Sequence, residues 1–155
     1  MSRLVVPDNL KAGVNRASFY DPEINLLYVG TGNGATWNRH LRSPGGGDNL
    51  FVSSIVALDA DTGKYAWHYQ ETPEDRWDFD SDQQITIADV TINGEKRHVA
   101  IHAPKNGHVY VLDVKTGKFI SGSAYTDLNW ASGLDANGGP IIKPEGQYWL
   151  HPEKA

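Results

Sequence analysis

The chain has 155 residues, of which 39% are hydrophobic and 21% are charged, a composition typical of one folded soluble domain and not of a disordered segment. Its net charge of −5 and its lack of a basic stripe exclude a nucleic-acid-binding surface, so no nucleic acid is expected as a partner. The absence of cysteine excludes disulfides and thiolate metal sites, and no apolar run approaches the roughly 18 residues that span a bilayer.

Short apolar runs between turns predict an all-β chain. The 16 glycines and 8 prolines divide the sequence into segments of strand length. In chain order, the expected strands are residues 14–20, 26–30, 53–58, 65–69, 85–90, 98–101, 108–112 and 118–120. A long loop at residues 35–49 and an acidic connection at residues 71–84 interrupt the series, and Asn93-Gly94 is typical of a hairpin turn.

An internal repeat indicates how these strands are organised. The segment ALDADTGK at residues 57–64 recurs 54 positions later as VLDVKTGK at residues 111–118, and each copy lies between two expected strands. Repeated units of four short antiparallel strands are typical of β-propeller blades, whose apolar faces must stack on neighbouring blades. The sequence therefore predicts two to three blades. A calcium loop starting at Asp59 is excluded, because Lys64 stands where that loop needs glycine and Gln70 where it needs glutamate.

Antiparallel alternation predicts which loops share one end of the blades. In an up-and-down blade, the loop between the second and third strands emerges at the same end as the connection to the next blade. Asn33 follows the second strand of the first blade, Lys105 follows the second strand of the second blade, and Asp78 lies in the connection between them. We therefore expect these three residues at one end of the propeller, together with the long loops.

The chemistry of these side chains suits a metal and carbonyl site. The Asn33 amide and the Asp78 carboxylate are hard oxygen ligands for a cation such as calcium, and the Lys105 ammonium suits an anionic or carbonyl oxygen. A carboxylate beside a cation stays ionised and can take a proton from a substrate. Trp37, four residues after Asn33, is a candidate wall of an apolar substrate cavity.

Each of these residues also has a plainer interpretation. Asn33 fits a structural Asn-Gly turn, and Lys105 fits a surface lysine. Asp78 lies in an acidic run that fits a solvated loop, although its neighbours Trp77 and Phe79 are unlike such a run. The other acidic residues of this run are Glu74, Asp75, Asp80 and Asp82.

A zinc site is the alternative suggested by the histidines of the second half. His98, His102 and His108 lie on or beside adjoining expected strands. Their alternate spacing scatters the side chains, and no histidine pair has the helical spacing of a zinc motif. The sequence therefore disfavours zinc binding by these three residues together.

Several short stretches between about Tyr20 and Ile141 carry a family resemblance: GTGNG at 30–34 with Trp37-Asn38, RSPGGGDNL at 42–50, WHYQETP at 67–73 with Trp77-Asp78, HAPKNG at 102–107 and NWASG at 129–133. In these stretches the chain resembles a central segment of the quinoprotein alcohol dehydrogenases, which use pyrroloquinoline quinone (PQQ) and calcium within an eight-bladed propeller. Residues 57–67 also resemble the blade-docking motif of that family, in which the tryptophan packs between blades. The second copy of this motif has Ser121 in place of Trp67.

The resemblance implies a role for each candidate residue. Asn33 and Asp78 would be calcium ligands, Asp78 would also be the base that removes the hydroxyl proton of the alcohol, and Lys105 would bind the quinone oxygens. The family pattern places the base at the Trp-Asp pair, so Asp48, the competing candidate, is assigned to shaping its loop. The implied reaction is oxidation of alcohols to aldehydes by base-assisted hydride transfer to the quinone, with PQQ and Ca²⁺ as cofactors.

The resemblance also carries expectations about partners and location. It implies an alcohol substrate, a cytochrome c or similar electron acceptor, and a periplasmic location, although the chain shows no signal peptide. The upstream glutamate ligand and the cysteine pair of the family have no counterpart, so the chain is expected to be a fragment that can self-associate through open blade edges. The alternative is a non-enzymatic propeller scaffold or binding segment, inactive without the missing blades.

The expected organisation has five parts. They are an N-terminal segment at residues 1–13, a first blade at 14–70 with the inserted loop 35–49, the acidic connection at 71–84, a second blade at 85–121, and the start of a further blade or an irregular tail at 122–155.

Overall fold

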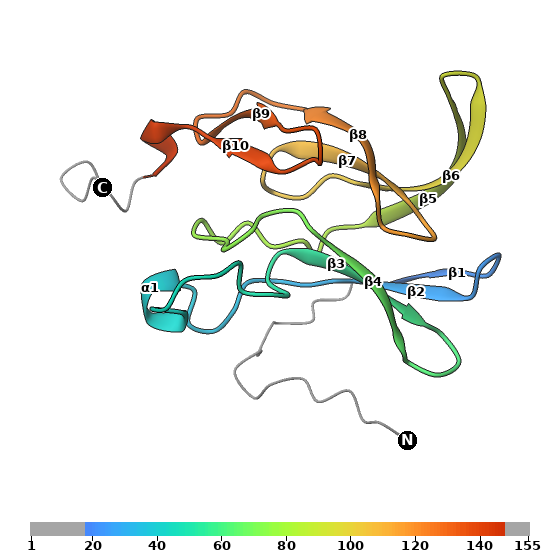
Figure 1. Ribbon diagram of the computed structural model, residues 1–155, viewed down its shortest axis with the longest axis horizontal. Coiled ribbons are helices and arrows are strands. Elements are labelled where there is room, and N and C mark those ends of the chain that lie inside the picture. The colour runs from blue at the N-terminus through green and yellow to red at the C-terminus, as the bar shows by residue number, and fades with distance from the viewer. Residues whose placement is uncertain (1–17, 148–155) are drawn as a thin grey trace.

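The computed structural model describes residues 18–147, which form two four-stranded antiparallel sheets and a two-stranded hairpin (Figure 1). The first sheet contains, in spatial order, β1 (Ser18–Asp21), β2 (Leu26–Gly30), β3 (Ser54–Asp59) and β4 (Tyr65–Gln70). The second contains β5 (Ile85–Ile92), β6 (Glu95–His102), β7 (His108–Asp113) and β8 (Phe119–Ala124) in the same order. The two sheets confirm the prediction of four-stranded antiparallel blades.

The hydrophobic core lies between the two sheets, which Figure 1 shows stacked one above the other. Tyr110 and Leu112 occupy alternate positions of β7 and are fully buried, as are Tyr28 of β2 and Ile55 of β3. Because successive side chains of a strand point to opposite faces, one face of each sheet supplies this core. Each blade therefore buries its apolar face on its neighbour, as the propeller prediction requires.

Trp67 of β4 links the two sheets. Its indole Nε1–H donates a hydrogen bond to the carbonyl oxygen of Val114 at 3.0 Å, and the Tyr28 hydroxyl donates to the same oxygen at 3.2 Å. The indole ring lies against Gly117, where an added Cβ atom would be 2.4 Å from the ring. Gly117 also has a φ of +68°, which glycine adopts without strain. The expected packing of Trp67 between the blades is confirmed.

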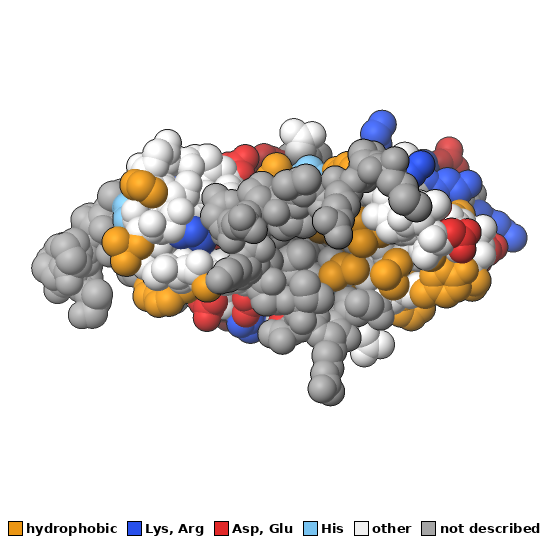
Figure 2. Space-filling model, turned by 90° about the horizontal axis from the view of Figure 1, so that it is seen from below, with side chains coloured by type: hydrophobic (Ala, Val, Ile, Leu, Met, Phe, Trp, Pro, Cys, Tyr) orange, Lys and Arg blue, Asp and Glu red, His pale blue; other side chains and the backbone are white. Residues whose placement is uncertain are grey.

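Large apolar side chains remain exposed on the first sheet. Phe19 and Tyr20 of β1 and Tyr65 of β4 each expose more than a third of their surface. Figure 2 shows one face of the molecule on which hydrophobic side chains gather in separate groups. Exposed apolar groups of this kind provide surface for further packing.

Two local structures were not among the strands expected from the sequence. The loop at residues 35–49 contains the one-turn helix α1 (Arg39–Arg42), whose N-cap Asn38 accepts a hydrogen bond from the His40 N–H at 3.0 Å. The segment expected to be the start of a further blade or an irregular tail contains β9 (Ala131–Leu134), β10 (Pro140–Ile142) and the 3₁₀ turn η1 (Pro144–Gly146). The hairpin of β9 and β10 fits the first of these alternatives, although the low periodicity of the segment predicted neither strand.

Some parts of the expected organisation lie outside the residues that the structure describes. Residues 1–13, the first residues of the expected strand at 14–20, and the end of the expected tail lie outside the described residues. The proposed boundaries of the five parts therefore stay predictions. Between residues 18 and 147, no helix has the length and apolar character that crossing a membrane requires.

Candidate functional site

Three loops meet beyond the ends of β2, β4 and β6, and Asp80 joins them. The Asn33 backbone N–H donates a hydrogen bond to Asp80 Oδ1 at 2.6 Å, and Lys105 Nζ donates to Asp80 Oδ2 at 2.6 Å. Lys105 Nζ also donates to the backbone carbonyl oxygen of Asp78 at 2.9 Å. The structure therefore brings Asn33, Asp78 and Lys105 together at one end of the sheets, with Asp80 between them.

Gly30 allows the acidic connection to approach β2 closely. An added Cβ atom at Gly30 would lie 2.0 Å from the carbonyl oxygen of Ser81. The Ser81 N–H donates a hydrogen bond to the carbonyl oxygen of Thr31 at 2.9 Å. The missing side chain at the end of β2 thus lets the backbone that carries Asp78 and Asp80 lie beside Asn33.

Asp75 holds the turn that carries Asp78 and Asp80. Its carboxylate is fully buried and accepts four hydrogen bonds from backbone N–H groups at 3.0–3.2 Å and one from a serine hydroxyl. The donors are the N–H groups of Trp77, Phe79 and Asp80 and the hydroxyl of Ser53. Asp78 and Asp80 have φ values of +62° and +59°, a left-handed conformation that is uncommon for non-glycine residues but that aspartate adopts more readily than most. The acidic run is therefore a structured turn and not the solvated loop that the sequence left open.

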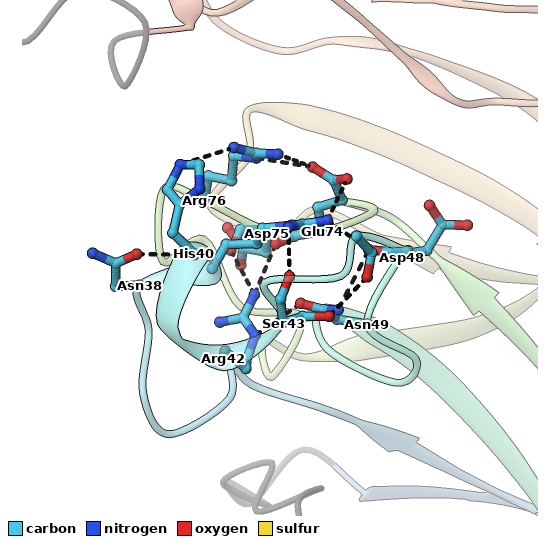
Figure 3. Close-up of polar contacts among 12 residues, drawn as sticks. Asn38, His40, Arg42, Ser43, Asp48, Asn49, Glu74, Asp75 and Arg76 are labelled. Atoms are coloured by element: carbon cyan, nitrogen blue, oxygen red, sulfur yellow. Dashed lines mark hydrogen bonds and ion pairs between the residues drawn. The ribbon is translucent and has the colours of Figure 1, made fainter.

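Arg42 of α1 connects the inserted loop to this turn (Figure 3). Its guanidinium donates hydrogen bonds to the carbonyl oxygens of Glu74 at 2.8 Å and Asp75 at 3.2 Å. The same group donates to Asn33 Oδ1 at 2.6 Å. Arg42 therefore fixes the direction of the Asn33 amide relative to the acidic connection.

The Glu74 carboxylate gathers two further arginines around the same turn. Arg39, which is 7% exposed, lies 3.1 Å from Glu74 Oε1, and Arg76 lies 2.6 Å from Glu74 Oε2. Figure 3 shows the side chain of Arg76 directed at the Glu74 carboxylate. Through Arg39 and Arg42, the one-turn helix α1 thus holds the segment that precedes Asp78 in place.

The side chains of Asp78 and Lys105 differ in their hydrogen-bond partners. The Asp78 side chain is exposed, and within residues 18–147 no hydrogen bond reaches its carboxylate. Partial burial alone would lower the pKa of Lys105, but the hydrogen bond that Lys105 donates to Asp80 and the charges of Asp80, Asp78 and Asp82 raise it above its ordinary value. Lys105 therefore carries a positive charge at neutral pH, next to a carboxylate that is free to accept a proton or a metal ion.

The oxygen atoms at this end fit a hard cation by their chemical type. Calcium takes carboxylate and amide oxygens, which Asn33, Asp78 and Asp80 provide. Asn33 Oδ1 accepts hydrogen bonds from Arg42 and, at 2.7 Å, from the Gly34 N–H. A cation bound by Asn33 Oδ1 would share this oxygen with Arg42 or replace it.

An aromatic hollow of about 450 Å³ lies beside Lys105. The ring centroid of Trp130 is 4.8 Å from that of Trp77 and 4.9 Å from that of Phe79, and all three rings line the hollow. Trp37, the expected wall of a substrate cavity, is 52% exposed and is not among the lining residues. Its role stays a prediction, while the hollow places three other rings near Lys105.

A buried ion pair ties the two blades together behind the site. The side chains of His102 at the end of β6 and Glu71 after β4 are both 0% exposed, and His102 Nδ1 lies 2.8 Å from Glu71 Oε1. His102 Nε2 lies 3.1 Å from the carbonyl oxygen of Gln83, so both ring nitrogens face acceptors. Desolvation lowers the pKa of His102, but the charge and hydrogen bond of Glu71 outweigh it and raise the pKa above its ordinary value. The doubly protonated ring satisfies both contacts.

The stability contributed by this pair is expected to fall as the pH rises. A histidine whose pKa is raised by folding contributes its full stability below the unfolded pKa of about 6.5 and loses it as the pH rises through the folded pKa. His102→Gln should lower the free energy of unfolding by roughly 3–5 kcal/mol at pH 6, and by less at pH 9. Urea unfolding of both proteins across this pH range tests the prediction, and a difference that stays constant with pH would contradict it.

Comparison with known proteins gives consistent matches. Residues 15–124 match a protein-family model that is named PQQ after the cofactor. This model describes the β-propeller domain of glucose, ethanol and alcohol dehydrogenases. The dehydrogenase subunit of the quinone alcohol dehydrogenase of Gluconacetobacter polyoxogenes is 59% identical over 132 residues, which cover 84% of this chain and 18% of that protein.

Solved structures agree with these matches. The quinohemoprotein alcohol dehydrogenase from Comamonas testosteroni aligns with 56% identity and a TM-score of 0.79 over 82% of this chain and 19% of that one. A europium-containing methanol dehydrogenase aligns with 40% identity and a TM-score of 0.78 over 83% of this chain and 22% of that one. The chain thus spans about a fifth of the length of these relatives.

Proposed function

Because the chain belongs to the PQQ β-propeller family of glucose, ethanol and alcohol dehydrogenases, we propose that it forms part of the active site of an enzyme that oxidises alcohols to aldehydes. The observation that carries the proposal is the meeting of Asn33, Asp78 and Lys105 around Asp80. A segment that served only as a scaffold would not need a lysine, an amide and an unbonded carboxylate at one end of its blades.

The proposed metal ligands of this chain are Asn33 and Asp78, and the proposed metal is Ca²⁺. The oxygen donors of both side chains, with Asp80 beside them, support a hard cation. The europium-containing methanol dehydrogenase holds a lanthanide, an ion that also prefers oxygen ligands, so La³⁺ is the alternative to test.

Asp78 is proposed as the base that removes the hydroxyl proton of the alcohol. Its exposed carboxylate accepts no hydrogen bond from residues 18–147, so it is available to accept a proton from a substrate. Lys105, held by Asp80 at 2.6 Å, presents an ammonium group for the quinone oxygens. When bound, PQQ would supply the oxidant that accepts the hydride equivalent, and the metal would polarise the quinone carbonyl.

The partners and the location follow as proposals from the same assignment. Names among the relatives include quinohemoprotein alcohol dehydrogenase of Comamonas testosteroni and 1-butanol dehydrogenase (cytochrome c) of Thauera butanivorans. These names support a cytochrome c or similar electron acceptor, and a periplasmic location is proposed from the family resemblance. The aromatic hollow beside Lys105 supports an apolar pocket for the alcohol, together with Trp37 if further parts of the protein cover it.

Titration of the purified chain with PQQ tests the proposal. We expect saturable binding that depends on Ca²⁺ or La³⁺. Quinone absorbance and tryptophan fluorescence both report this binding. Lys105→Gln should weaken binding about tenfold or more, because a charged hydrogen bond to the quinone is lost. Lys64→Gln is the matched control, because Lys64 is exposed and precedes β4 at the opposite end of the first sheet.

Two results would count against this assignment. A folded chain that binds no PQQ with either metal would favour the scaffold alternative, in which these blades only support a site built by other parts of the protein. Equal affinities of the Lys105 and Lys64 variants would remove Lys105 from the quinone site.

A further inference from the structure

A second cluster of metal-ligating side chains lies at the opposite end of the blades. Asp21 ends β1, Glu23 lies in the turn between β1 and β2, and His98 lies on β6 of the second sheet. His98 Nε2 is 2.8 Å from Asp21 Oδ2 and 3.2 Å from Glu23 Oε2, and all three ligand atoms lie within 4.8 Å of one another. The cluster therefore joins the two blades through one imidazole nitrogen and two carboxylates.

The other ring nitrogen of His98 already has a partner. Asp89 is the register neighbour of His98 across β5 and β6, and its Oδ1 lies 2.6 Å from His98 Nδ1. Because Nε2 lies 2.8 Å from Asp21 Oδ2, it carries a proton in the metal-free chain, and a metal ion would replace that proton. Asp89 would keep the proton on Nδ1, which is the arrangement of histidines that bind metals. The orientation of the ring thus aims Nε2 at Asp21 and Glu23.

Burial and access support a ligand at this place. Asp21 is 2% exposed, and its Oδ1 accepts the Glu23 N–H at 3.0 Å, so the carboxylate is fixed before any ion binds. A solvent-open hollow is lined by Glu23, Asp89 and His98, which gives an ion a path to the cluster. Lys96 and Arg97 also line this hollow, and Arg97 pairs with Glu95 at 2.5 Å.

The charge of the cluster favours a divalent cation. Three carboxylates, those of Asp21, Glu23 and Asp89, surround one imidazole. An imidazolium would leave this group with a net charge of −2, whereas a divalent ion with neutral imidazole would leave −1. A buried carboxylate such as Asp21 is costly unless a cation compensates it.

We propose that Asp21, Glu23 and His98 bind a divalent metal ion, with Zn²⁺ as the preferred ion, and that this ion fastens the β1–β2 turn of the first blade to β6 of the second. Ligands about 2.0–2.2 Å from a tetrahedral zinc stand roughly 3.3–3.5 Å apart, so the observed spacings need only small side-chain movements. The nitrogen ligand favours zinc over calcium and magnesium, which prefer oxygen.

This site differs from the zinc site that the sequence disfavoured. His102 is paired with Glu71 and His108 is fully buried, so neither reaches His98. The cluster also lies at the end of the blades away from Lys105 and Asp78, so the proposal does not depend on the proposed function.

Isothermal titration of the metal-free chain with Zn²⁺ tests the proposal. The wild-type chain should bind one Zn²⁺ more than His98→Gln. Glu23→Gln should weaken Zn²⁺ binding about tenfold or more, because it removes a ligand. Asp89→Asn should have a similar effect, because it removes the carboxylate that holds the His98 ring. Glu23 and Asp89 are 69% and 77% exposed, so these two substitutions leave the fold intact. Co²⁺ in place of Zn²⁺ should give a visible absorption band with the wild-type chain that His98→Gln lacks.

Lys96→Gln provides the control, because Lys96 lines the same hollow but offers no ligand to the cluster, and it should not weaken binding. Equal Zn²⁺ affinity of the wild-type and Glu23→Gln chains would overturn the proposal. Failure of the folded wild-type chain to bind Zn²⁺ would also overturn it, and would leave His98 as an imidazolium shared by carboxylates.

Discussion

Replacing Asp78 with asparagine is expected to lower the rate of alcohol oxidation by about 10²–10⁴-fold while PQQ and the metal remain bound. Asparagine keeps an oxygen that can face a cation, but it cannot accept the hydroxyl proton of the alcohol. The left-handed φ of +62° at Asp78 is well tolerated by asparagine, so the turn should be preserved. The measurement is kcat with a primary alcohol in a chimaera that carries this segment in the matching place of the Comamonas testosteroni dehydrogenase.

Asp48→Asn is the matched control for this prediction. Asp48 is the acidic residue that competes with Asp78 as a base, and its carbonyl oxygen accepts hydrogen bonds from the Glu74 N–H at 2.9 Å and from Gln70 Nε2 at 2.8 Å. Because these contacts use only its backbone, the substitution should change neither the loop nor kcat. An unchanged kcat in Asp78→Asn would remove Asp78 from the role of base, and a large loss in Asp48→Asn would transfer that role.

The blades could be predicted from sequence because their turns depend on local chemistry. Asp59 Oδ1 accepts the Thr62 N–H at 2.8 Å, and Asp113 Oδ1 accepts the Thr116 N–H at 2.9 Å. The two copies of the repeat therefore form the same turn for the same reason, and the apolar strands on either side follow from it. The one-turn helix α1 gave no such signal, because four residues are too few for a helical period.

The candidate site could be predicted only in part. Antiparallel alternation brought Asn33, Asp78 and Lys105 to one end, since this needs only the order of the strands. The roles of Asp75 and Asp80 could not be foreseen, because both belong to an acidic run that resembles a solvated loop. Their importance arises from a turn that buries one carboxylate and directs the other, and the only sequence signal was the aromatic residues within the run.

The contact of Arg42 with Asn33 is likewise invisible in the sequence. The two residues are nine positions apart and meet only because α1 folds the inserted loop back onto the turn, with Arg42 Nη1 2.6 Å from Asn33 Oδ1. This contact means that the candidate metal ligand is positioned by a cation of the protein itself. The sequence predicted Asn33 as a candidate ligand but gave no signal for the arginine that holds its side chain.

The second large effect is expected from Trp67→Ala, which should lower the free energy of unfolding by about 3–5 kcal/mol. The substitution empties the space between the blades, removes the hydrogen bond to the Val114 carbonyl oxygen, and withdraws the ring that covers Gly117. Tyr28 still donates to the same carbonyl oxygen at 3.2 Å, so the loss should come mainly from packing and not from an unpaired acceptor.

Urea unfolding of Trp67→Phe and Trp37→Ala, monitored by circular dichroism, separates the contribution of packing from that of the hydrogen bond. Trp67→Phe keeps an aromatic ring but lacks the donor, so its loss should be clearly smaller than that of Trp67→Ala. Trp37→Ala removes the same side chain from a 52% exposed position and should change stability by no more than about 0.5 kcal/mol. If Trp67→Ala cost no more than Trp37→Ala, the two blades would not depend on this contact, and the stability of the pair would have to come from the Glu71–His102 end of their interface.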